Sequence, residues 1–504
     1  MALRKTAGYA WNLISLIGMV LAVTATGLII VFLAFEAITG IDHPYLGLMT
    51  YFLFPGMLIF GLLLVPVGAY RVRNERRKES PEEIPSYPRL DLNDPPKRHL
   101  FVFFIVATIV FVVIVAIASI QGFHFTESTT FCGEVCHVVM EPEHTAWSNS
   151  PHAKVKCVEC HVGPGAAWYV KAKISGMRQL YAVMFHTYPE TIETPIHNLR
   201  PARETCEHCH WPEKFYAGRQ KIYYHYAPNE TNTPREINLL VNIGGNPKSP
   251  HAKGIHWHIG TEVSYIAGDK KRLTIPYVVV KGKDGKITEY MDTENPLSKE
   301  DVAKKDKRLM DCTDCHNRPT HIYRAPGVEM DENFVSGHID PSLPYLKKVA
   351  VEILGKPYKT SEEAKAAIAS GITDYYAKNY PKVAKDKAAA INQAIDRVQD
   401  IYSRNFFPKM KVSWNTYPDH IGHFYTPGCF RCHDGRHKSP EGKIISKDCN
   451  MCHTVLSQKQ ENIPPGTRVT QFVHPVDIGD ELFKTNCSDC HSAGGQDVPG
   501  GGGH

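Results

Sequence analysis

Residues 131–161 read FCGEVCHVVMEPEHTAWSNSPHAKVKCVECH, and this stretch contains two cysteine pairs that are each followed directly by histidine. In the second pair, two residues separate Cys157 from Cys160, and His161 comes next. This spacing is typical of c-type haem attachment, in which two thiols add to the haem vinyl groups and the adjacent histidine binds the iron. A single copy would be only a moderate signal for haem.

The same haem motif recurs along the rest of the chain. The further copies are Cys206, Cys209 and His210; Cys312, Cys315 and His316; Cys429, Cys432 and His433; Cys449, Cys452 and His453; and Cys487, Cys490 and His491. With the first pair, Cys132 and Cys136 followed by His137, the motifs number seven and use all fourteen cysteines. The sequence therefore predicts seven covalently bound haem c groups.

Two other uses of paired cysteines fit less well. Structural zinc sites often take cysteine pairs two at a time and need no histidine after every pair, whereas this chain has an odd number of pairs that all end in histidine. Disulfide scaffolds are typical of short secreted chains, and this chain has 504 residues. Three residues separate Cys132 from Cys136, so attachment through one thioether, or a plain cysteine pair, stays open there.

The composition indicates a chain of which only a minority lies in a membrane. The apolar content of 43% and the mean hydropathy of −0.27 are too low for a polytopic membrane protein. A formal net charge of +5 is small for this length and gives no sign of a nucleic-acid partner. Of the 26 histidines, nineteen lie outside the haem motifs, which is more than second axial ligands alone require.

Three apolar runs precede the first motif, at residues 10–35, 46–70 and 100–120, each close to the roughly 20 residues that a helix needs to cross a bilayer. A cleaved signal peptide is the alternative for the first run, but that run is long and leads straight into the second. Arg4 and Lys5 precede the first run, the loop 36–46 has no lysine or arginine, and residues 71–98 hold eight. The positive-inside rule then predicts a bacterial inner-membrane protein with a cytoplasmic N-terminus and all seven motifs in the periplasm.

These patterns divide the chain into six parts. We expect a three-helix transmembrane anchor (1–121), a domain with haems one to three (122–225), a β-rich insertion (226–309), a part with the fourth haem and a helical region (310–410), a part with haems five to seven (411–491) and a flexible tail (492–504). Residues 122–504 are too few for seven globin-sized domains, so haems must supply much of the core. The predicted fold is a membrane-anchored multihaem cytochrome c with a mostly α-helical or irregular, haem-packed periplasmic domain.

Local patterns refine two of these parts. The insertion has five β-rich runs, INLLVNI, GIHWHIG, EVSYIA, LTIPYVVV and KITEYM, with a hairpin turn at 283–286, and we expect one small sheet. In the helical region, Thr360 and Glu363 form a potential capping box. An apolar stripe with helical spacing follows at Ile391, Ile395, Val398 and Tyr402.

Each iron needs a second axial ligand besides its motif histidine. Met140, three residues after His137, is the expected ligand at the first haem because methionine raises the reduction potential, and His144 is the alternative. His152 and His251 lie in two copies of the pentapeptide SPHAK and are also expected ligands. The other expected ligands are His197, His321, His423 and His474, and the competing histidines are His186, His256, His258, His420 and His437.

Residues 131–215 resemble the NapC/NirT family of membrane-anchored, quinol-oxidising cytochromes. The resemblance rests on the cysteine pair soon after a membrane run, on Met140-Glu141, on the SPH motif, and on CVECHVGPGAAW, KAKISGMRQLY and CEHCHWPEKF at 157–168, 171–181 and 206–215. The seven motifs, three membrane runs and long C-terminal extension make the whole chain similar to heptahaem inner-membrane cytochromes of metal-reducing bacteria.

The resemblance implies a quinol site beside the first haem at the periplasmic membrane face. In the family this haem has an unusual axial arrangement that involves a methionine, and quinol binds near a lysine and an acidic residue. Carried over, these residues fall on Met140, on Lys171 or Lys173, and on Gln179. Gln179 is not acidic, which puts the family's base in doubt here. Other candidate bases are Glu141, Glu36, Asp42 and His43.

Three functions are compatible with the sequence. The first is a quinol dehydrogenase of the quinol:cytochrome c oxidoreductase type, which takes electrons from the membrane quinol pool, with menaquinol the expected substrate, and passes them to periplasmic c-type cytochromes in anaerobic or extracellular respiration. The second is a terminal reductase with an open axial site, and the third is a passive electron wire docked to another membrane complex. The one altered motif lies beside the membrane, which favours quinol. A homo-oligomer is compatible with the sequence.

Overall fold

The computed structural model describes residues 12–39, 49–76, 92–135, 137–163, 165–196, 200–244, 254–282, 284–479, 485 and 491. The chain forms two compact units, one made of residues 1–132 and 156–180 and the other of residues 133–155 and 181–504.

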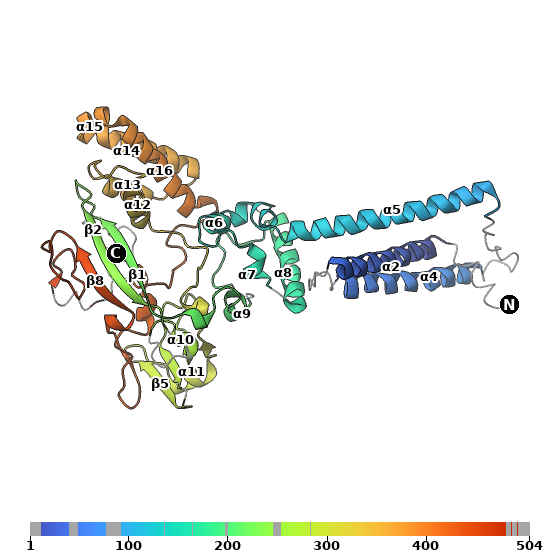
Figure 1. Cartoon of the computed structure of the whole chain (residues 1–504), viewed down its shortest axis with the longest axis horizontal. Coiled ribbons are helices and arrows are strands. Elements are labelled where there is room, and N and C mark those ends of the chain that lie inside the picture. The colour runs from blue at the N-terminus through green and yellow to red at the C-terminus, as the bar shows by residue number, and fades with distance from the viewer. Residues whose placement is uncertain are drawn as a thin grey trace. The chain divides into compact units, whose positions relative to one another are not determined.

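Three long helices dominate the first unit: α2 (Leu13–Thr39), α4 (Phe54–Arg76) and α5 (Pro95–Thr126), with the π-helix η2 (Met49–Leu53) leading into α4 (Figure 1). Helices α2 and α4 approach closely where two glycines meet, because a Cβ on Gly18 would lie 2.6 Å from the carbonyl oxygen of Gly61. Such small residues are typical of helix contacts within membranes. Val112 of α5 is buried in one cluster with Leu28 of α2.

Two of these helices are long and apolar enough to cross a membrane, over Leu13–Phe35 in α2 and Phe54–Val72 in α4. The third predicted run, residues 100–120, lies within α5. All three predicted runs are therefore helical where the structure describes them, and a membrane crossing by α5 stays a prediction.

Two shorter helices complete the first unit, α7 (Cys157–His161) and the part of α8 (Ala166–Met184) up to residue 180. Helix α8 matches the helical segment expected at 171–181. Tyr169 of α8 and Phe123 of α5 are buried together, with Met49 and Val162 packed beside them. This apolar contact holds α8 against the end of α5.

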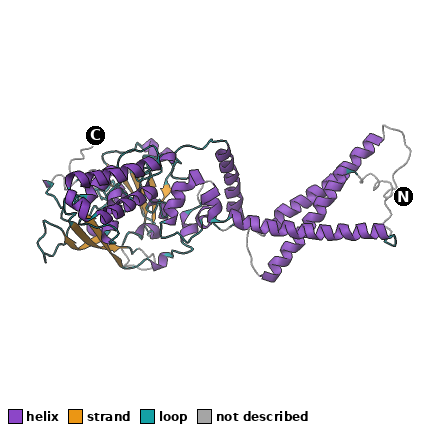
Figure 2. Ribbon diagram, turned by 90° about the horizontal axis from the view of Figure 1, so that it is seen from above, coloured by secondary structure: helices purple, strands orange, loops and turns teal. Residues whose placement is uncertain are grey.

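A bundle of helices holds the largest apolar core among the described residues of the second unit. Its members are α12 (Pro326–Val335), α13 (Leu346–Leu354), α14 (Ser361–Asn379), α15 (Pro381–Asp386) and α16 (Ala388–Asn405) (Figure 1). Figure 2 shows that the part of the chain with strands also holds many helices. The predicted stripe is confirmed, since Ile391, Ile395, Val398 and Tyr402 are all buried in this core. Thr360 caps α14, with its hydroxyl oxygen accepting a hydrogen bond from the Glu363 N–H at 3.1 Å. The predicted capping box forms only in this half, because the Glu363 carboxylate accepts from the Lys359 N–H at 2.9 Å and not from the Thr360 N–H.

Two antiparallel sheets lie in the second unit. One has the order β1-β2-β8, with β1 (Gly218–Tyr226), β2 (Pro234–Asn242) and β8 (His453–Lys459). The other has the order β6-β3-β4-β5-β7, with β3 (Glu262–Ile266), β4 (Tyr277–Lys281), β5 (Ile287–Asp292), β6 (Arg308–Leu309) and β7 (His437–Lys438). The hairpin turn between β4 and β5 is confirmed, and Gly285 within it has a φ of 78°.

The strands differ from the expectation of one small sheet in two ways. Strands β7 and β8 come from beyond the helical bundle and pair with β5 and β2, so both sheets draw on distant parts of the chain. The run GIHWHIG was predicted as a strand but contains the helical turn α10 (Trp257–Gly260). The expectation was wrong because a short apolar run does not distinguish strand from helix by its pattern.

The remaining elements are short and connect the motifs. They are η3 (Phe131–Val135), α6 (His137–Ser148), α9 (Ala202–Cys206), η4 (Pro212–Lys214), α11 (Lys299–Lys304), η5 (Cys312–Asp314), η6 (Pro408–Met410), η7 (Gly428–Arg431) and η8 (Cys449–Met451).

Candidate functional site

The third, fourth and fifth haem motifs share a local geometry based on a single helical turn. The backbone N–H of the motif histidine donates to the carbonyl of the first cysteine, at 2.8 Å for His210 to Cys206 and for His316 to Cys312, and at 3.0 Å for His433 to Cys429. In such a turn, positions i, i+3 and i+4 lie on one face, so the two thiols and the imidazole share a side. None of the eleven cysteines that the structure describes forms a disulfide. Cys136, Cys487 and Cys490 lie outside the described residues.

Five motif histidines face the ring of a second histidine. The ring centroids are 6.1 Å apart for His152 and His210, 6.4 Å for His256 and His316, 5.9 Å for His258 and His433, 6.1 Å for His423 and His453, and 6.4 Å for His474 and His491. Two imidazoles that bind one metal ion through nitrogens at about 2 Å have centroids about 6 Å apart. The residues present therefore fit haem iron held by two histidines.

In several of these rings, Nδ1 lies within hydrogen-bond distance of a backbone carbonyl oxygen. The Nδ1 atoms of His256, His258, His433 and His474 lie 2.6, 2.8, 2.8 and 2.7 Å from the carbonyl oxygens of Ile243, Ile255, Ser446 and Val476. A ring that donates its Nδ1–H to a carbonyl keeps the lone pair of Nε2 for a metal. These bonds orient the rings for ligation.

Burial lowers the pKa of His258, His316, His423 and His453. Burial acts in this direction because it disfavours the charged imidazolium. The neutral ring is the form that binds a metal, so the electrostatics agree with the geometry.

Two competing histidines are held by the protein itself. In His437 one ring nitrogen lies 2.9 Å from the Asp434 carboxylate and the other 2.6 Å from the carbonyl oxygen of Ile275. In His420 the Nε2 atom lies 3.1 Å from the carbonyl oxygen of Lys271. Both ring nitrogens of His437 are occupied by hydrogen bonds, so His437 is a poor candidate, whereas Nδ1 of His420 is buried with no hydrogen-bond partner among the described residues and His420 stays a competing ligand.

The fourth and fifth motifs are fastened to each other. Arg431, which lies between the two cysteines of the fifth motif, donates from Nη2 to the backbone carbonyl of Asp314 at 2.7 Å. Asp314 lies between the two cysteines of the fourth motif. The histidines that face these two motifs, His256 and His258, are only two residues apart. The two candidate sites are therefore linked twice, once through Arg431 between the two cysteine loops and once through the short backbone segment from His256 to His258.

Residues 95–210 match the model of the NapC/NirT cytochrome c family, N-terminal region. The whole chain is 72% identical to the cytochrome c-type protein ImcH of Geobacter sulfurreducens over 501 residues, which is 99% of each chain. This chain belongs to the ImcH family of c-type cytochromes, with a membrane-proximal region of NapC/NirT type. It is thus a membrane-anchored, haem-containing electron-transport protein.

A shorter match agrees with this. Over 78 residues the chain is 32% identical to the cytochrome c-type protein NrfH of Wolinella succinogenes, which covers 15% of this chain and 44% of that protein. No solved structure matches this cytochrome significantly.

One predicted ligand of the cytochrome, His321, is positioned by a buried carboxylate. Its Nδ1 lies 2.9 Å from a carboxylate oxygen of Glu143, and Arg318 lies 3.2 Å from the same carboxylate. Burial raises the pKa of Glu143, but the hydrogen bond with His321 and the charge of Arg318 lower it to about 2. The carboxylate therefore stays ionised and holds Nδ1 of His321, as an outer-shell partner of a ligand does.

At the first motif both alternatives for the second ligand remain. Met140 lies one turn after His137 on α6. His144 packs against Gly133, which lies within the first cysteine pair, so closely that a Cβ on Gly133 would be 2.2 Å from the ring. His144 also stacks on Trp147, with centroids 5.3 Å apart. The predicted ligands His197 and His251 lie outside the described residues.

The residues of the predicted quinol site that lie on α8 have different surroundings. Lys173 forms an ion pair with Glu127, whereas Lys171 lies over the ring of Trp168 at 4.7 Å from its centroid. Gln179 is exposed, with its amide nitrogen 3.4 Å from the hydroxyl of Ser175.

The other candidate bases do not belong to α8. Glu141 is an exposed residue of α6, and Glu36 belongs to α2. Asp42 and His43 lie outside the described residues. Glu127 was not considered from sequence; the available signal was an acidic residue between the predicted run 100–120 and Cys132.

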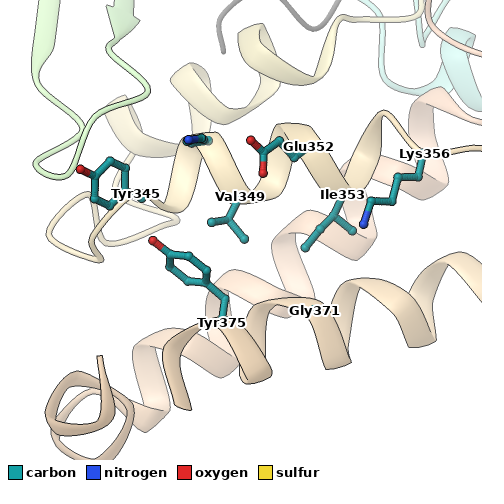
Figure 3. A pocket seen from close by; sticks show the side chains of 8 residues that line it. Tyr345, Val349, Glu352, Ile353, Lys356, Gly371 and Tyr375 are labelled. Atoms are coloured by element: carbon teal, nitrogen blue, oxygen red, sulfur yellow. The ribbon is translucent and has the colours of Figure 1, made fainter. Parts of the chain in front are cut away.

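A groove in the helical bundle lies between α13 and α14 (Figure 3). It is lined by Tyr345, Val349, Glu352, Ile353, Lys356 and Tyr375, among others, and by no histidine or cysteine. We therefore assign it no part in haem binding.

Proposed function

We propose that this cytochrome oxidises membrane quinol at the periplasmic face of the inner membrane and passes the electrons along seven haems to periplasmic c-type cytochromes. Menaquinol is the proposed substrate, and anaerobic or extracellular respiration is the proposed setting. The observation that carries the proposal is the set of five histidine pairs at about 6 Å, because each motif histidine of these pairs faces a second ring.

Ligation by two histidines makes a haem an electron carrier, since both axial positions are then closed to substrate. We propose His152, His256, His258, His423 and His474 as the second ligands of the third to seventh haems, in that order. His321, with its Nδ1 on Glu143, and Met140 or His144 would serve the other two irons. This set supplies seven ligands without His197 and His251. We therefore propose that His256 and His258 replace His197 and His251 in the set of second ligands.

This arrangement argues against a terminal reductase among haems three to seven, because such an enzyme needs an open axial position. The quinol side of the proposal rests on the NapC/NirT region and on the lysines of α8. The NapC/NirT resemblance implies quinol oxidation near a lysine, and Lys173 is the one that faces a carboxylate. A protein that only conducts electrons from another membrane complex would not need a quinol-binding site.

The test is reduction of the purified holoprotein by a menaquinol analogue, followed through the haem absorption bands. We expect rapid reduction that a quinone analogue inhibits and that reaches the level obtained with dithionite. Reduction by dithionite but by no quinol would refute the dehydrogenase and leave the passive wire. A high-spin haem that binds nitrite or hydroxylamine would instead favour the reductase.

A further inference from the structure

Glu127 and Lys173 form an ion pair at the C-terminal end of α5. Glu127 follows directly after Thr126, the last residue of α5, and its carboxylate accepts a hydrogen bond from the Lys173 ammonium group. Glu127 is only 9% exposed, whereas the side chain of Lys173 is 35% exposed. Burying a carboxylate is costly unless a cation compensates it, and Lys173 supplies that cation while keeping access to the surface.

Apolar and aromatic side chains surround this pair. The Lys173 ammonium lies 5.0 Å from the ring centroid of Tyr169, and that ring is 6.4 Å from the ring of Phe123. Met49, at the start of η2, packs in the same cluster. A few charged groups within an apolar, aromatic wall are typical of a site for an apolar ligand with polar ends.

The pair also lies near the first haem motif. Glu127 is five residues before Cys132, and the Cys132 N–H donates to the carbonyl of Ser128, the residue after Glu127, at 3.2 Å. Glu127 therefore lies close to the first cysteine of that motif. A quinol held by the pair would give up its electrons close to the first haem.

The exposed face of α8 next to the pair is apolar. Val170, Ile174 and Met177 are exposed and follow one another at spacings of four and three residues, which places them on one face of the helix. An isoprenoid tail would therefore meet apolar side chains beside Lys173.

We propose that Glu127 is the base of the quinol site and that Lys173 donates a hydrogen bond to a quinol oxygen. This inference rests on the proposed quinol oxidation and supplies the carboxylate that Gln179 cannot. Oxidation of one quinol breaks two O–H bonds. The two protons would pass in turn to the Glu127 carboxylate and on to water, and the two electrons would leave one at a time through the first haem, so that two ferric haem groups each take one electron.

The deciding variant is Glu127→Gln, which keeps the shape of the side chain and removes the base. We expect its quinol-driven haem reduction to be at least about 100-fold slower than that of the wild type, the lower end of what a general base contributes. Haem content by mass and reduction by dithionite should not change. Glu190→Gln is the matched control, because Glu190 also pairs with a lysine, Lys411, but on the surface.

A second variant separates a base from a merely structural residue. Glu127→Asp keeps a carboxylate and should recover most of the rate that Glu127→Gln loses. A Glu127→Gln rate within threefold of the wild type would overturn the assignment, as would an equal loss of rate in Glu127→Asp and Glu127→Gln, or a loss of rate confined to Glu141→Gln. A wild type that no quinol reduces would end the proposed function itself.

Discussion

Replacing Asp314 by alanine should loosen the loop of the fourth haem motif, Cys312 to His316. Its carboxylate is 1% exposed and accepts hydrogen bonds from the Tyr265 hydroxyl at 2.5 Å, from Arg308 Nε at 2.8 Å and from Arg272 Nη1 at 3.0 Å. It also accepts a bond from the Asp311 N–H at 2.7 Å, which closes the capping box of η5. One carboxylate thus ties the motif to β3 and to the residues beside it.

The size of the effect follows from this burial. Removing one partner of a buried ion pair typically costs 3–5 kcal/mol. The side chains of Arg308 and Arg272 are 36% and 20% exposed, so water can partly replace the lost contact. We therefore expect the lower end, about 3 kcal/mol, which corresponds to roughly 150-fold in the opening equilibrium of this region.

Native-state hydrogen exchange of the holoprotein measures this directly, because it reports local opening free energies. Amides of β3 and β4 should exchange about two orders of magnitude faster in Asp314→Ala, and less so in Asp314→Asn, which keeps a hydrogen-bond acceptor. Asp306→Ala, at an exposed position of the same region, should change nothing. Equal protection in Asp314→Ala and Asp306→Ala would refute the reasoning.

Four further predictions follow from the same principles. Lys347 is fully buried with its Nζ 2.9 Å from Asp331, so Lys347→Met should cost about 3 kcal/mol in urea unfolding, and adding Asp331→Asn should recover part of this; no recovery would count against the pair. His258→Ala should turn one haem high-spin by electron paramagnetic resonance, whereas His437→Ala should turn none. The intact mass should exceed that of the polypeptide by seven haems, while zinc in place of iron would end the haem interpretation. Protease added outside spheroplasts should release the haem-bearing fragment, and protection of that fragment would contradict the periplasmic orientation.

Local chemistry was readable from the sequence because the haem motif and the capping residues each lie within a few neighbouring positions. Cys157, Cys160 and His161 predict a haem site without any knowledge of the fold. The cap at Thr360 and the buried stripe from Ile391 to Tyr402 depend on near neighbours in the sequence, and the structure confirms the stripe and the Thr360 half of the capping box. The resemblance to the NapC/NirT family is likewise confirmed, by the match at residues 95–210.

Second ligands and strand partners were harder to predict because they join distant segments. The sequence does not distinguish a histidine that is hydrogen-bonded to a carboxylate, as His437 is to Asp434, from one that faces a motif histidine, as His258 does. Only the bonds of the two ring nitrogens separate these cases. The pairing of β2 with β8 depends in the same way on residues beyond the helical bundle. Glu127 was missed because its partner, Lys173, becomes its neighbour only when α8 packs against α5.

The segment from His256 to His258 is expected to keep two neighbouring candidate haems at a fixed separation. The rate of electron transfer falls steeply with distance, so a chain of carriers works only if neighbouring carriers are held at fixed spacing. In this cytochrome, His256 faces the fourth motif and His258 the fifth, while Arg431 bonds the two attachment loops together. The two proposed irons would then be connected on both of their axial sides. A shift of this segment would move both ligands at once, which favours a constant separation between the fourth and fifth haems over independent motion of either.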